Sequence, residues 1–317
     1  MSTSTTMRAI GVREWGGPEV LTTVEIERPE PGVSEILVRV HAAGVNAVDW
    51  KTRASGGLIA WGSPPIVGWD VSGTVEALGP GVTLFQPGDQ VFGMPHFPRQ
   101  AGGYAEFVAA PARQFVRKPD TITHIEAAAL PLAALTAWQG LIDTAELRAG
   151  QRVLIHAAAG GVGHLAVQIA KARGAYVIGT ARADKHEFLR ALGSDEVIDY
   201  TTVDYAEAVR DVDVVLDAVG GDYGTRSLRT LRPGGHLVTL PGPDDVPPAD
   251  EAAALGARTG WTMVELDSAG LRAIADLVAA GRLRPEIDTV LPLAEAGKAH
   301  AYGETGRARG KIVLQVV

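Results

Sequence analysis

The chain has 317 residues and a formal net charge of −8, with 46% hydrophobic and 21% charged residues. This composition excludes a disordered chain, and the negative charge argues against binding to nucleic acid, which requires a basic patch. The absence of cysteine excludes disulfides, thiolate metal sites and a cysteine nucleophile. The N-terminus lacks the features of a secretory signal, and no apolar run approaches the ~18 residues of a membrane span. We therefore expect a cytoplasmic protein that does not associate with membranes.

Residues 8 to about 125 are expected to be rich in β-structure. Segments 36–40, 71–78 and 90–92 have the apolar patterning of short strands. Turns containing glycine and proline, such as Gly79-Pro80-Gly81, separate them. Short strands with frequent turns predict a small barrel or sandwich for this part of the chain.

The pattern changes after residue 125. Residues 125–141 are rich in alanine and predict a helix, interrupted at Pro131. From residue 152 onward, strands alternate with helices. Strands are predicted at 152–156, 175–180, 196–199, 212–217 and 236–240, and helices at 163–173, 185–192 and 271–280. This alternation predicts βαβ units and a parallel sheet, and a last strand is expected at 310–317.

The strongest local signal is the segment Ala158 to Gly163, with the sequence Ala-Ala-Gly-Gly-Val-Gly. It follows a predicted strand and opens a predicted helix, which is the context that a dinucleotide-binding turn requires. Glycines let the backbone approach a pyrophosphate, and the helix N-terminus supplies free N–H groups. Ala158 stands where the usual pattern has its first glycine, so an ordinary tight turn is the alternative interpretation.

The next strand indicates which dinucleotide is bound. NAD-binding proteins usually place an acidic residue near its end for the ribose hydroxyl, whereas a cation there accommodates the phosphate of NADP. Here Arg182 and Lys185 flank the strand end, and we therefore expect NADPH. The alternative for this pair is an ordinary charged helix start. Tyr200, at the end of the following strand, is expected beside the adenine, or else as an aromatic residue at the rim.

Several motifs in order along the chain resemble the medium-chain dehydrogenase/reductase superfamily, and within it the zinc-free quinone oxidoreductase group related to zeta-crystallin. They extend from Gly44 to Lys311. The matching segments are Gly44 to Asp49, Gly68 to Gly73, Gly88 to Gly93, Ala127 to Trp138, Leu231 to Val238 and Gly310 to Leu314.

The resemblance implies an α/β protein with a doubly wound Rossmann parallel sheet and a β-rich GroES-like catalytic domain. We expect residues 1–125, completed by 260–317, to form the catalytic domain, and residues 126–259 to form the NADP-binding domain. The resemblance also implies that the nicotinamide lies in a cleft between the domains. Segment 260–264 is expected to pair two copies edge to edge in a homodimer, or else to be an internal strand.

Zinc is not expected. Zinc-dependent relatives carry a cysteine where this chain has Asn46 and a histidine where it has Trp69, and an indole cannot ligate a metal. Alcohol oxidation in those relatives uses the metal as a Lewis acid. Without it, the chemistry is expected to be hydride delivery to an acceptor that is already electrophilic, such as a quinone or an α,β-unsaturated carbonyl.

Site residues follow from the resemblance and from position. Asn46 and Thr136 would hold the nicotinamide end, or else Asn46 stabilises a turn and the Thr136 hydroxyl bonds its own helix backbone. The pyrophosphate would meet Ala159, Gly160, Gly161 and Val162, with Gly163 closing the turn. Positions at the carboxyl ends of later strands would line the nicotinamide ribose, because open α/β sheets bind ligands at that edge. These positions are Gly220, Thr239, Leu240 and Pro241.

Lys51 marks a departure from the family pattern. Many relatives of zeta-crystallin carry a tyrosine at this position, two residues after Asp49. Lys51 could pair with a cofactor phosphate or polarise a carbonyl, or it could be an ordinary surface lysine. Trp61, Trp69 and Phe97 could form an apolar pocket for a flat substrate, although aromatic residues more often belong to a core.

The predicted function is zinc-independent transfer of hydride from NADPH to a quinone or to the activated C=C bond of an enone. One alternative is a non-catalytic NADPH-binding protein, such as a redox sensor, with the same sequence features. The other is a zinc-type alcohol dehydrogenase, which Asn46 and Trp69 oppose.

Overall fold

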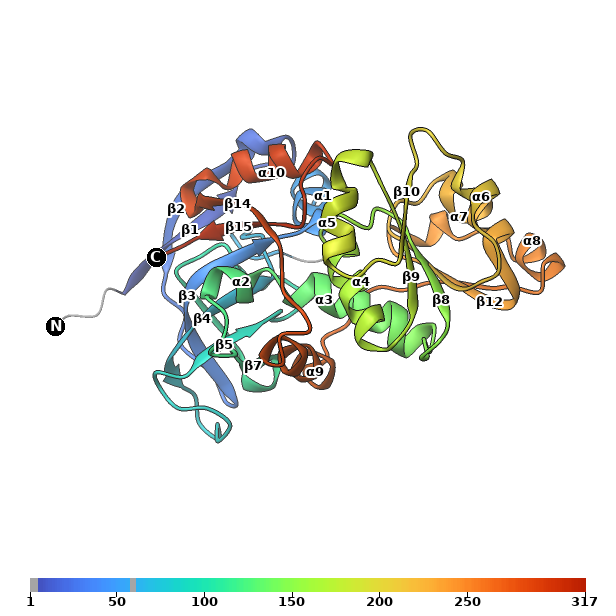
Figure 1. Ribbon diagram of the computed structural model, residues 1–317. Helices are drawn as coiled ribbons and strands as arrows, with labels where there is room; N and C mark the ends of the chain where they lie inside the picture. The colour runs from blue at the N-terminus through green and yellow to red at the C-terminus, as the bar shows by residue number, and fades with distance from the viewer. Residues whose placement is uncertain (1–4, 58–60) are drawn as a thin grey trace. The chain divides into compact units, whose positions relative to one another are not determined.

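The computed structural model describes residues 5–57 and 61–317 (Figure 1). The chain divides into two compact units. The β-rich unit comprises residues up to Leu132 together with Leu266–Val317, and the parallel-sheet unit comprises Ala133–Glu265. The expected boundaries at 125/126 and 259/260 lie a few residues before those of the structure.

The β-rich unit contains a seven-stranded sheet in the order β14-β15-β3-β4-β5-β7, with β6 also paired to β3. Its strands are β3 (Glu35–Val45), β4 (Asp70–Leu78), β5 (Gln90–Gly93), β6 (Phe107–Pro111), β7 (Phe115–Arg117), β14 (Ile287–Pro292) and β15 (Lys311–Gln315). A separate antiparallel pair is formed by β1 (Thr6–Val12) and β2 (Leu21–Glu27). The β-rich character expected for this region is confirmed.

The last strand of the chain, β15, lies inside the sheet of this unit, between β14 and β3. β15 is antiparallel to β3, with Ile312 opposite Val45, and β4 is antiparallel to β3 on its other side. In Figure 1 the red β15 therefore lies beside the blue β3. Because both neighbours run antiparallel, the end of β3 meets the beginnings of β4 and β15. Residues far apart in sequence are thereby brought to one edge of the sheet.

Short helices complete the β-rich unit. They are α1 (Ala47–Ser55), α2 (His124–Ala128), α9 (Ser268–Ala279) and α10 (Ala296–Glu304). The boundary between the units falls within α3 (Pro131–Trp138), which begins at its proline because that residue has no N–H to satisfy there. A π-helical segment, Gln139–Thr144, follows. The helix expected over 125–141 is thus three segments.

The parallel-sheet unit has six strands in the order β10-β9-β8-β11-β12-β13, all parallel. The strands are β8 (Arg152–Ile155), β9 (Tyr176–Ala181), β10 (Glu196–Asp199), β11 (Val212–Asp217), β12 (Leu231–Thr239) and β13 (Arg258–Trp261). Central strands are buried on both faces, so Val153, Leu154 and Ile155 form a continuous apolar run rather than an alternating one. The predicted parallel sheet is confirmed.

Helices cover both faces of this sheet. In Figure 1, α4 (Gly163–Ala172) and α5 (His186–Ala191) lie on one face, and α6 (Tyr205–Ala208), α7 (Asp222–Ser227) and α8 (Ala249–Ala254) lie toward the other. The strand expected at 260–264 begins earlier, at Arg258, and joins the sheet beside β12. Among the described residues β13 pairs only with β12, and the pairing of two copies along it stays a prediction.

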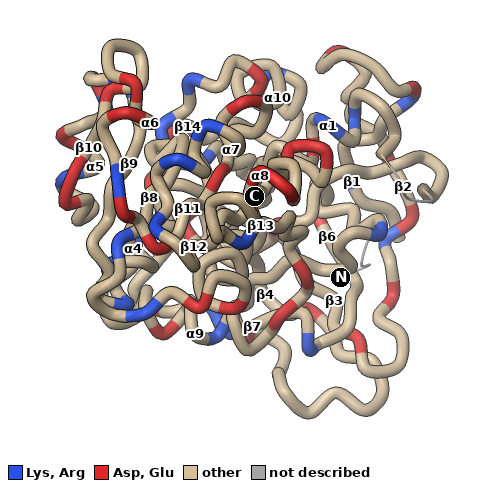
Figure 2. The backbone as a smooth tube through the Cα atoms, turned by 90° about the vertical axis from the view of Figure 1, so that its right-hand side faces the viewer, with Lys and Arg blue, Asp and Glu red and all other residues tan. Residues whose placement is uncertain are grey.

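The distribution of charge and the length of the helices bear on whether the chain binds nucleic acid or a membrane. Figure 2 shows both signs of charge around the strands β8 to β12. Within residues 5–57 and 61–317, no helix is long and apolar enough to cross a membrane.

Candidate functional site

The predicted cofactor residues gather at the carboxyl edge of the parallel sheet. The segment Ala158 to Gly163 connects the end of β8 to the start of α4. Inside this turn, the N–H of Ala158 donates to the carbonyl of Thr180 (3.0 Å), and the N–H of Gly160 donates to the carbonyl of Ala157 (2.9 Å). These bonds fix the turn against the neighbouring strand β9.

Four other N–H groups of the turn, those of Ala159, Gly161, Val162 and Gly163, have no acceptor among the described residues. We call the first three, which precede α4, the amide cradle. Unsatisfied N–H groups at the start of a helix attract anions, because the helix dipole adds positive potential there. A pyrophosphate fits this set of donors.

The glycines of the turn have different roles. A Cβ at Gly163 would lie 2.3 Å from the carbonyl oxygen of Ala157, so this residue must be glycine for α4 to pack against the turn. A Cβ at Gly160 would be 3.2 Å from the same oxygen. Gly163 is therefore required by the fold, whereas the surroundings of Gly160 are far less restrictive.

The expected phosphate-binding pair lies at the ends of two adjacent strands. Arg182 follows β9 and Tyr200 follows β10, and Arg182 Nε donates to the Tyr200 hydroxyl (3.2 Å). Lys185 Nζ lies 3.9 Å from Asp184. Arg182 and Tyr200 are exposed, and no acidic residue occupies the end of β9 itself. The structure thus brings Arg182 and Tyr200 together at the position predicted for the adenosine phosphate.

Two polar side chains at the ends of β11 and β12 have atoms without partners. Asp217 and Thr239 are neighbours in the strand register, and both are fully buried. Asp217 Oδ1 accepts from the N–H groups of Val219 and Gly220, but Asp217 Oδ2 and Thr239 Oγ1 have no hydrogen-bond partner among the described residues. Burial raises the pKa of Asp217. Unpaired buried groups are costly, so they favour a hydroxyl-bearing ligand such as a ribose.

The remaining predicted ribose residues lie at the same edge. Gly220 has a φ of +80°, and a Cβ there would be 2.6 Å from Asp245. Leu240 donates its N–H to the carbonyl of Asp217 (2.9 Å), and Pro241 follows. Thr239 was predicted here, whereas Asp217 was missed, although it is an acidic residue at the end of a predicted strand.

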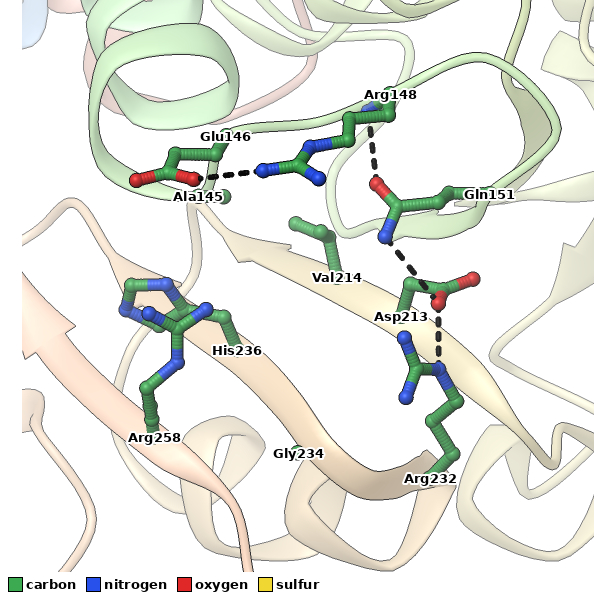
Figure 3. Close-up of a pocket in the computed structure, with 10 residues that line it drawn as sticks. All are labelled: Ala145, Glu146, Arg148, Gln151, Asp213, Val214, Arg232, Gly234, His236 and Arg258. Atoms are coloured by element: carbon green, nitrogen blue, oxygen red, sulfur yellow. Dashed lines mark hydrogen bonds and ion pairs between the residues drawn. The ribbon is translucent and has the colours of Figure 1, made fainter.

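A shallow pocket of about 130 Å³ opens at the opposite, amino edge of the same sheet (Figure 3). Its lining includes three arginines. Arg148 lies in the loop before β8, Arg232 near the start of β12 and Arg258 at the start of β13. The Arg232 Nε donates to Asp213 (2.5 Å) and Arg148 pairs with Glu146. None of the predicted cofactor residues lines this pocket.

In the β-rich unit, Asn46 belongs to a buried polar group that we call the Asn46 cluster, composed of Asn46, Asp70 and Lys311. Asn46 Nδ2 donates to Asp70 Oδ2 (2.8 Å), and Lys311 Nζ donates to Asn46 Oδ1 and to the carbonyl of Val45 (2.9 Å). Lys311 and Asp70 also form an ion pair at 3.9 Å. All three side chains are buried, because they sit where β3, β4 and β15 meet.

Burial dominates the electrostatics of this cluster. It raises the pKa of Asp70 to about 6, against the opposing effects of Lys311 and the Asn46 amide, and it lowers the pKa of Lys311. Asp70 Oδ1 also accepts from the N–H of Leu132 (2.8 Å). Gly44 makes room for this arrangement, since a Cβ there would lie 2.9 Å from the Cβ of Asp70.

A second buried chain of polar groups adjoins the first. Asp49 Oδ2 accepts from the N–H of Asn46 (2.7 Å) and from the hydroxyl of Tyr104 (3.0 Å), which also contacts His300 Nε2 (3.1 Å). Burial raises the pKa of Asp49 to about 7 and lowers that of His300 to about 3. Glycine at position 68 makes room for this chain of polar groups, because a Cβ there would lie 2.2 Å from the Tyr104 ring.

The other two predicted catalytic residues lie outside these clusters. Lys51 is exposed on α1, and its ammonium has no partner among the described residues. Thr136 is buried on α3. The Trp69 ring lies next to the rings of Trp61 and Phe97, with centroid distances of 6.2 and 5.4 Å. Trp69 is only 1% exposed, so it belongs to the core.

Donors suitable for a metal are not gathered anywhere in the described part of the chain, where no group of three or more His, Asp or Glu side chains could hold an ion. At the Asn46 cluster the groups present are an amide, one carboxylate and an ammonium. An ammonium repels a cation, and this donor set does not suit zinc.

The structure combines a parallel sheet, which carries a glycine turn at its carboxyl edge, with a separate β-rich unit, and this is the architecture expected of a two-domain NAD(P)-dependent oxidoreductase. Comparison with known proteins supports this class. Residues 32–120 match the family model of the alcohol dehydrogenase GroES-like domain, and residues 192–314 match that of the zinc-binding dehydrogenases. The chain belongs to the medium-chain dehydrogenase/reductase superfamily, as its motifs predicted.

Individual relatives are similar over nearly the whole chain. The mouse mitochondrial NAD(P)H oxidoreductase RTN4IP1 is 35% identical, with 99% of this chain and 90% of the relative covered. The quinone oxidoreductase of Coxiella burnetii is 37% identical, with a TM-score of 0.88 over 98% of this chain and 100% of that one. A mycobacterial protein, Rv1454c, solved in complex with NADPH, is 32% identical with a TM-score of 0.87, covering 98% and 100%.

Proposed function

We propose that the chain is a zinc-independent, NADPH-dependent reductase of quinones or of the activated C=C bond of α,β-unsaturated carbonyls. The observation that carries this proposal is the Asn46 cluster. At the position where zinc-type relatives carry a cysteine, this chain has a buried amide held by an ammonium and a carboxylate. Two of the similar proteins are a quinone oxidoreductase and a complex with NADPH, which supports both halves of the proposal.

NADPH is favoured over NADH by the charges at the end of β9. Arg182 and Lys185 supply positive charge there, and the strand ends without an acid that would repel a phosphate. The amide cradle of Ala159, Gly161 and Val162 suits the pyrophosphate. Asp217 Oδ2 and Thr239 Oγ1 offer an acceptor and a hydroxyl to the ribose.

The bound cofactor would supply a hydride to the β-carbon of an enone, or a hydride to a quinone, which takes one further proton to become the hydroquinone. The residues of this chain bind, orient and exclude water. We assign Asn46 and Thr136 to the nicotinamide end of the site, and Lys51 to a cofactor phosphate or a substrate carbonyl. For an enone, the α-carbon takes a proton from solvent, so that one NADPH and one proton reduce one C=C bond.

The test is NADPH oxidation by chelator-treated, metal-analysed protein with a simple quinone and a short enone side by side. Turnover of either acceptor without bound zinc supports the proposal, and the faster acceptor defines the branch. NADPH binding without turnover of either would favour the sensor alternative. Activity that disappears with zinc and returns on its addition would favour the alcohol dehydrogenase alternative.

A further inference from the structure

We propose that Lys311 and Asp70 act as positioning residues that fix the Asn46 carboxamide as a hydrogen-bond donor to a carbonyl oxygen. The inference rests on the proposed function, since it assigns chemistry to the same site. The carbonyl belongs to the reducible substrate or to the nicotinamide carboxamide. At a substrate carbonyl, Asn46 would take over part of the electrophilic role that a metal plays in zinc-type relatives, and at the nicotinamide carboxamide it would orient the cofactor.

The orientation of the amide follows from what its two neighbours can do. An ammonium has only donors, and an ionised carboxylate has only acceptors, whereas a carboxamide has one of each. Asn46 Oδ1 must therefore face Lys311, and Nδ2 must face Asp70. Rotation of the amide by 180° would place two donors together and two acceptors together.

The neighbours are themselves held in place. Lys311 Nζ donates to the carbonyl of Val45, at the end of β3, as well as to Asn46. Asp70 Oδ1 accepts from the N–H of Leu132, so Asp70 Oδ2 is left for Asn46. With side chains at most 2% exposed, neither Lys311 nor Asp70 can turn away toward solvent.

One donor of the amide then remains. Asn46 Nδ2 carries two hydrogens, and only the bond to Asp70 uses one of them within residues 5–57 and 61–317. The backbone N–H of Asn46 is already bonded to Asp49, so it does not compete for the same ligand. A ligand that meets the remaining N–H must supply an acceptor, and the acceptor common to enones, quinones and nicotinamide is a carbonyl oxygen.

The charges also strengthen this donor. An ammonium at Oδ1 draws electron density from the amide and polarises its N–H groups, and the effect is larger where water is excluded. Burying an ion pair seldom stabilises a protein more than apolar side chains of similar size. Orientation of Asn46 gives a reason for Lys311 and Asp70 that stability alone does not.

The first measurement uses the intact protein without cofactor. Side-chain ¹H–¹⁵N spectra should show two well-separated, slowly exchanging Asn46 amide protons, because each hydrogen has a fixed environment. Lys311→Met should collapse that separation, and Lys311→Arg should restore it in part. Lys298→Met is the matched control, since Lys298 is exposed and pairs with Glu295 outside the cluster. An unchanged Asn46 signal in folded Lys311→Met would overturn the proposal.

Steady-state kinetics then measure how much Asn46 and Lys311 contribute to the reaction. We expect kcat to fall about 100-fold in Asn46→Leu, the scale of losing one oxyanion donor, and about tenfold in Lys311→Met. If the partner is the substrate carbonyl, KM for the acceptor rises and Kd for NADPH stays constant. If it is the nicotinamide carboxamide, Kd for NADPH rises, and a thiocarboxamide analogue shows a smaller difference between wild type and variant.

The two proposals fail separately. A wild-type protein that reduces neither acceptor contradicts the proposed function, whereas the Asn46 spectrum still tests the cluster. Wild-type values of kcat, KM and Kd in a folded Lys311→Met protein contradict the positioning role. Should this variant not fold, Lys311→Met combined with Asp70→Asn removes both charges, and the same readouts apply to it and to Lys311→Arg.

Discussion

The two units place their functional groups by different means. In the parallel-sheet unit, the amide cradle is made of backbone N–H groups within one turn, at Ala159, Gly161 and Val162. In the β-rich unit, the Asn46 cluster is made of side chains that are 24 and 265 residues apart from Asn46 along the chain. A local turn can be recognised from a short pattern, whereas a cluster built from three strand ends depends on the sheet order.

The first prediction separates binding from folding within the glycine turn. Gly160→Val should lower NADPH affinity by about 100-fold or more, because a branched side chain displaces the pyrophosphate from the cradle. The thermal midpoint should fall less than in Gly163→Val, because a Cβ at Gly160 would lie 3.2 Å from the carbonyl oxygen of Ala157, compared with 2.3 Å for a Cβ at Gly163. Gly163→Val is the contrasting variant, and it should lose stability as well. Fluorescence titration measures the NADPH affinity of each variant, and thermal melts measure its stability. A Gly160→Val protein with normal NADPH affinity would contradict the pyrophosphate role of the amide cradle.

The second prediction concerns the charges at the end of β9. Replacing Arg182 and Lys185 with alanine should raise KM for NADPH by about 10- to 100-fold, the scale of one or two charge-assisted hydrogen bonds. KM for NADH should change far less, because NADH lacks the phosphate. Arg173→Ala, on the same unit, serves as the control. Equal changes in KM for NADPH and for NADH would contradict the assignment of Arg182 and Lys185 to the cofactor phosphate.

The third prediction uses the buried Asp49. Burial raises its pKa from 3.8 to about 7, so the folded protein holds this proton more tightly than the unfolded chain does. The ionised form therefore costs stability, increasingly from about pH 4 to pH 7, up to about 4 kcal/mol above pH 7. Asp70, Lys311, Tyr104 and the Asn46 N–H are the groups that act on it.

Asp49→Asn removes this ionisation and keeps an acceptor for Tyr104 and Asn46. Its stability relative to wild type should therefore rise between pH 4 and pH 7 and then level off. Denaturant melts of the two proteins at several pH values give this difference in stability directly. The lowered pKa of His300 gives both proteins the opposite trend with pH, so its effect cancels in the difference. A difference that does not depend on pH would contradict a carboxyl with a raised pKa.

The smallest effect is expected at Lys51. Its ammonium is exposed and has no partner in the described part of the chain, so Lys51→Met should change stability by less than about 0.5 kcal/mol. A role at a phosphate or a carbonyl would lower kcat/KM about tenfold in that folded variant. Unchanged kcat/KM would assign Lys51 to the surface.

The same comparison explains what the sequence could predict. The parallel sheet, the glycine turn and the residues at its carboxyl edge follow from periodicity and from the rule that such sheets bind ligands there. Asp217 was not predicted, because only the structure shows that one oxygen of its buried carboxylate has no partner among the described residues. Arg182 and Tyr200 were predicted separately, and their hydrogen bond depended on β9 and β10 being neighbours.

The β-rich unit was harder to predict at the level of contacts. Asn46 was identified by resemblance, but its partners Asp70 and Lys311 were noted only as members of motifs. Their meeting requires β15 to pair with β3 on the side opposite β4, which no local pattern shows. For the same reason, Tyr104 and His300 were not predicted to join Asp49 in one chain of polar groups. Buried polar groups on distant segments become visible only when the sheet order is known.

Direct hydride transfer without zinc is the central claim, and isotope transfer tests it most directly. Chelator-treated protein would reduce a short enone with NADPH carrying deuterium at C4, prepared separately in each stereochemical form. We predict one deuterium at the β-carbon of the product from one form and none from the other, as measured by mass spectrometry and NMR. A reduced product without deuterium from either form, or no product at all from either the enone or a quinone, would contradict the account.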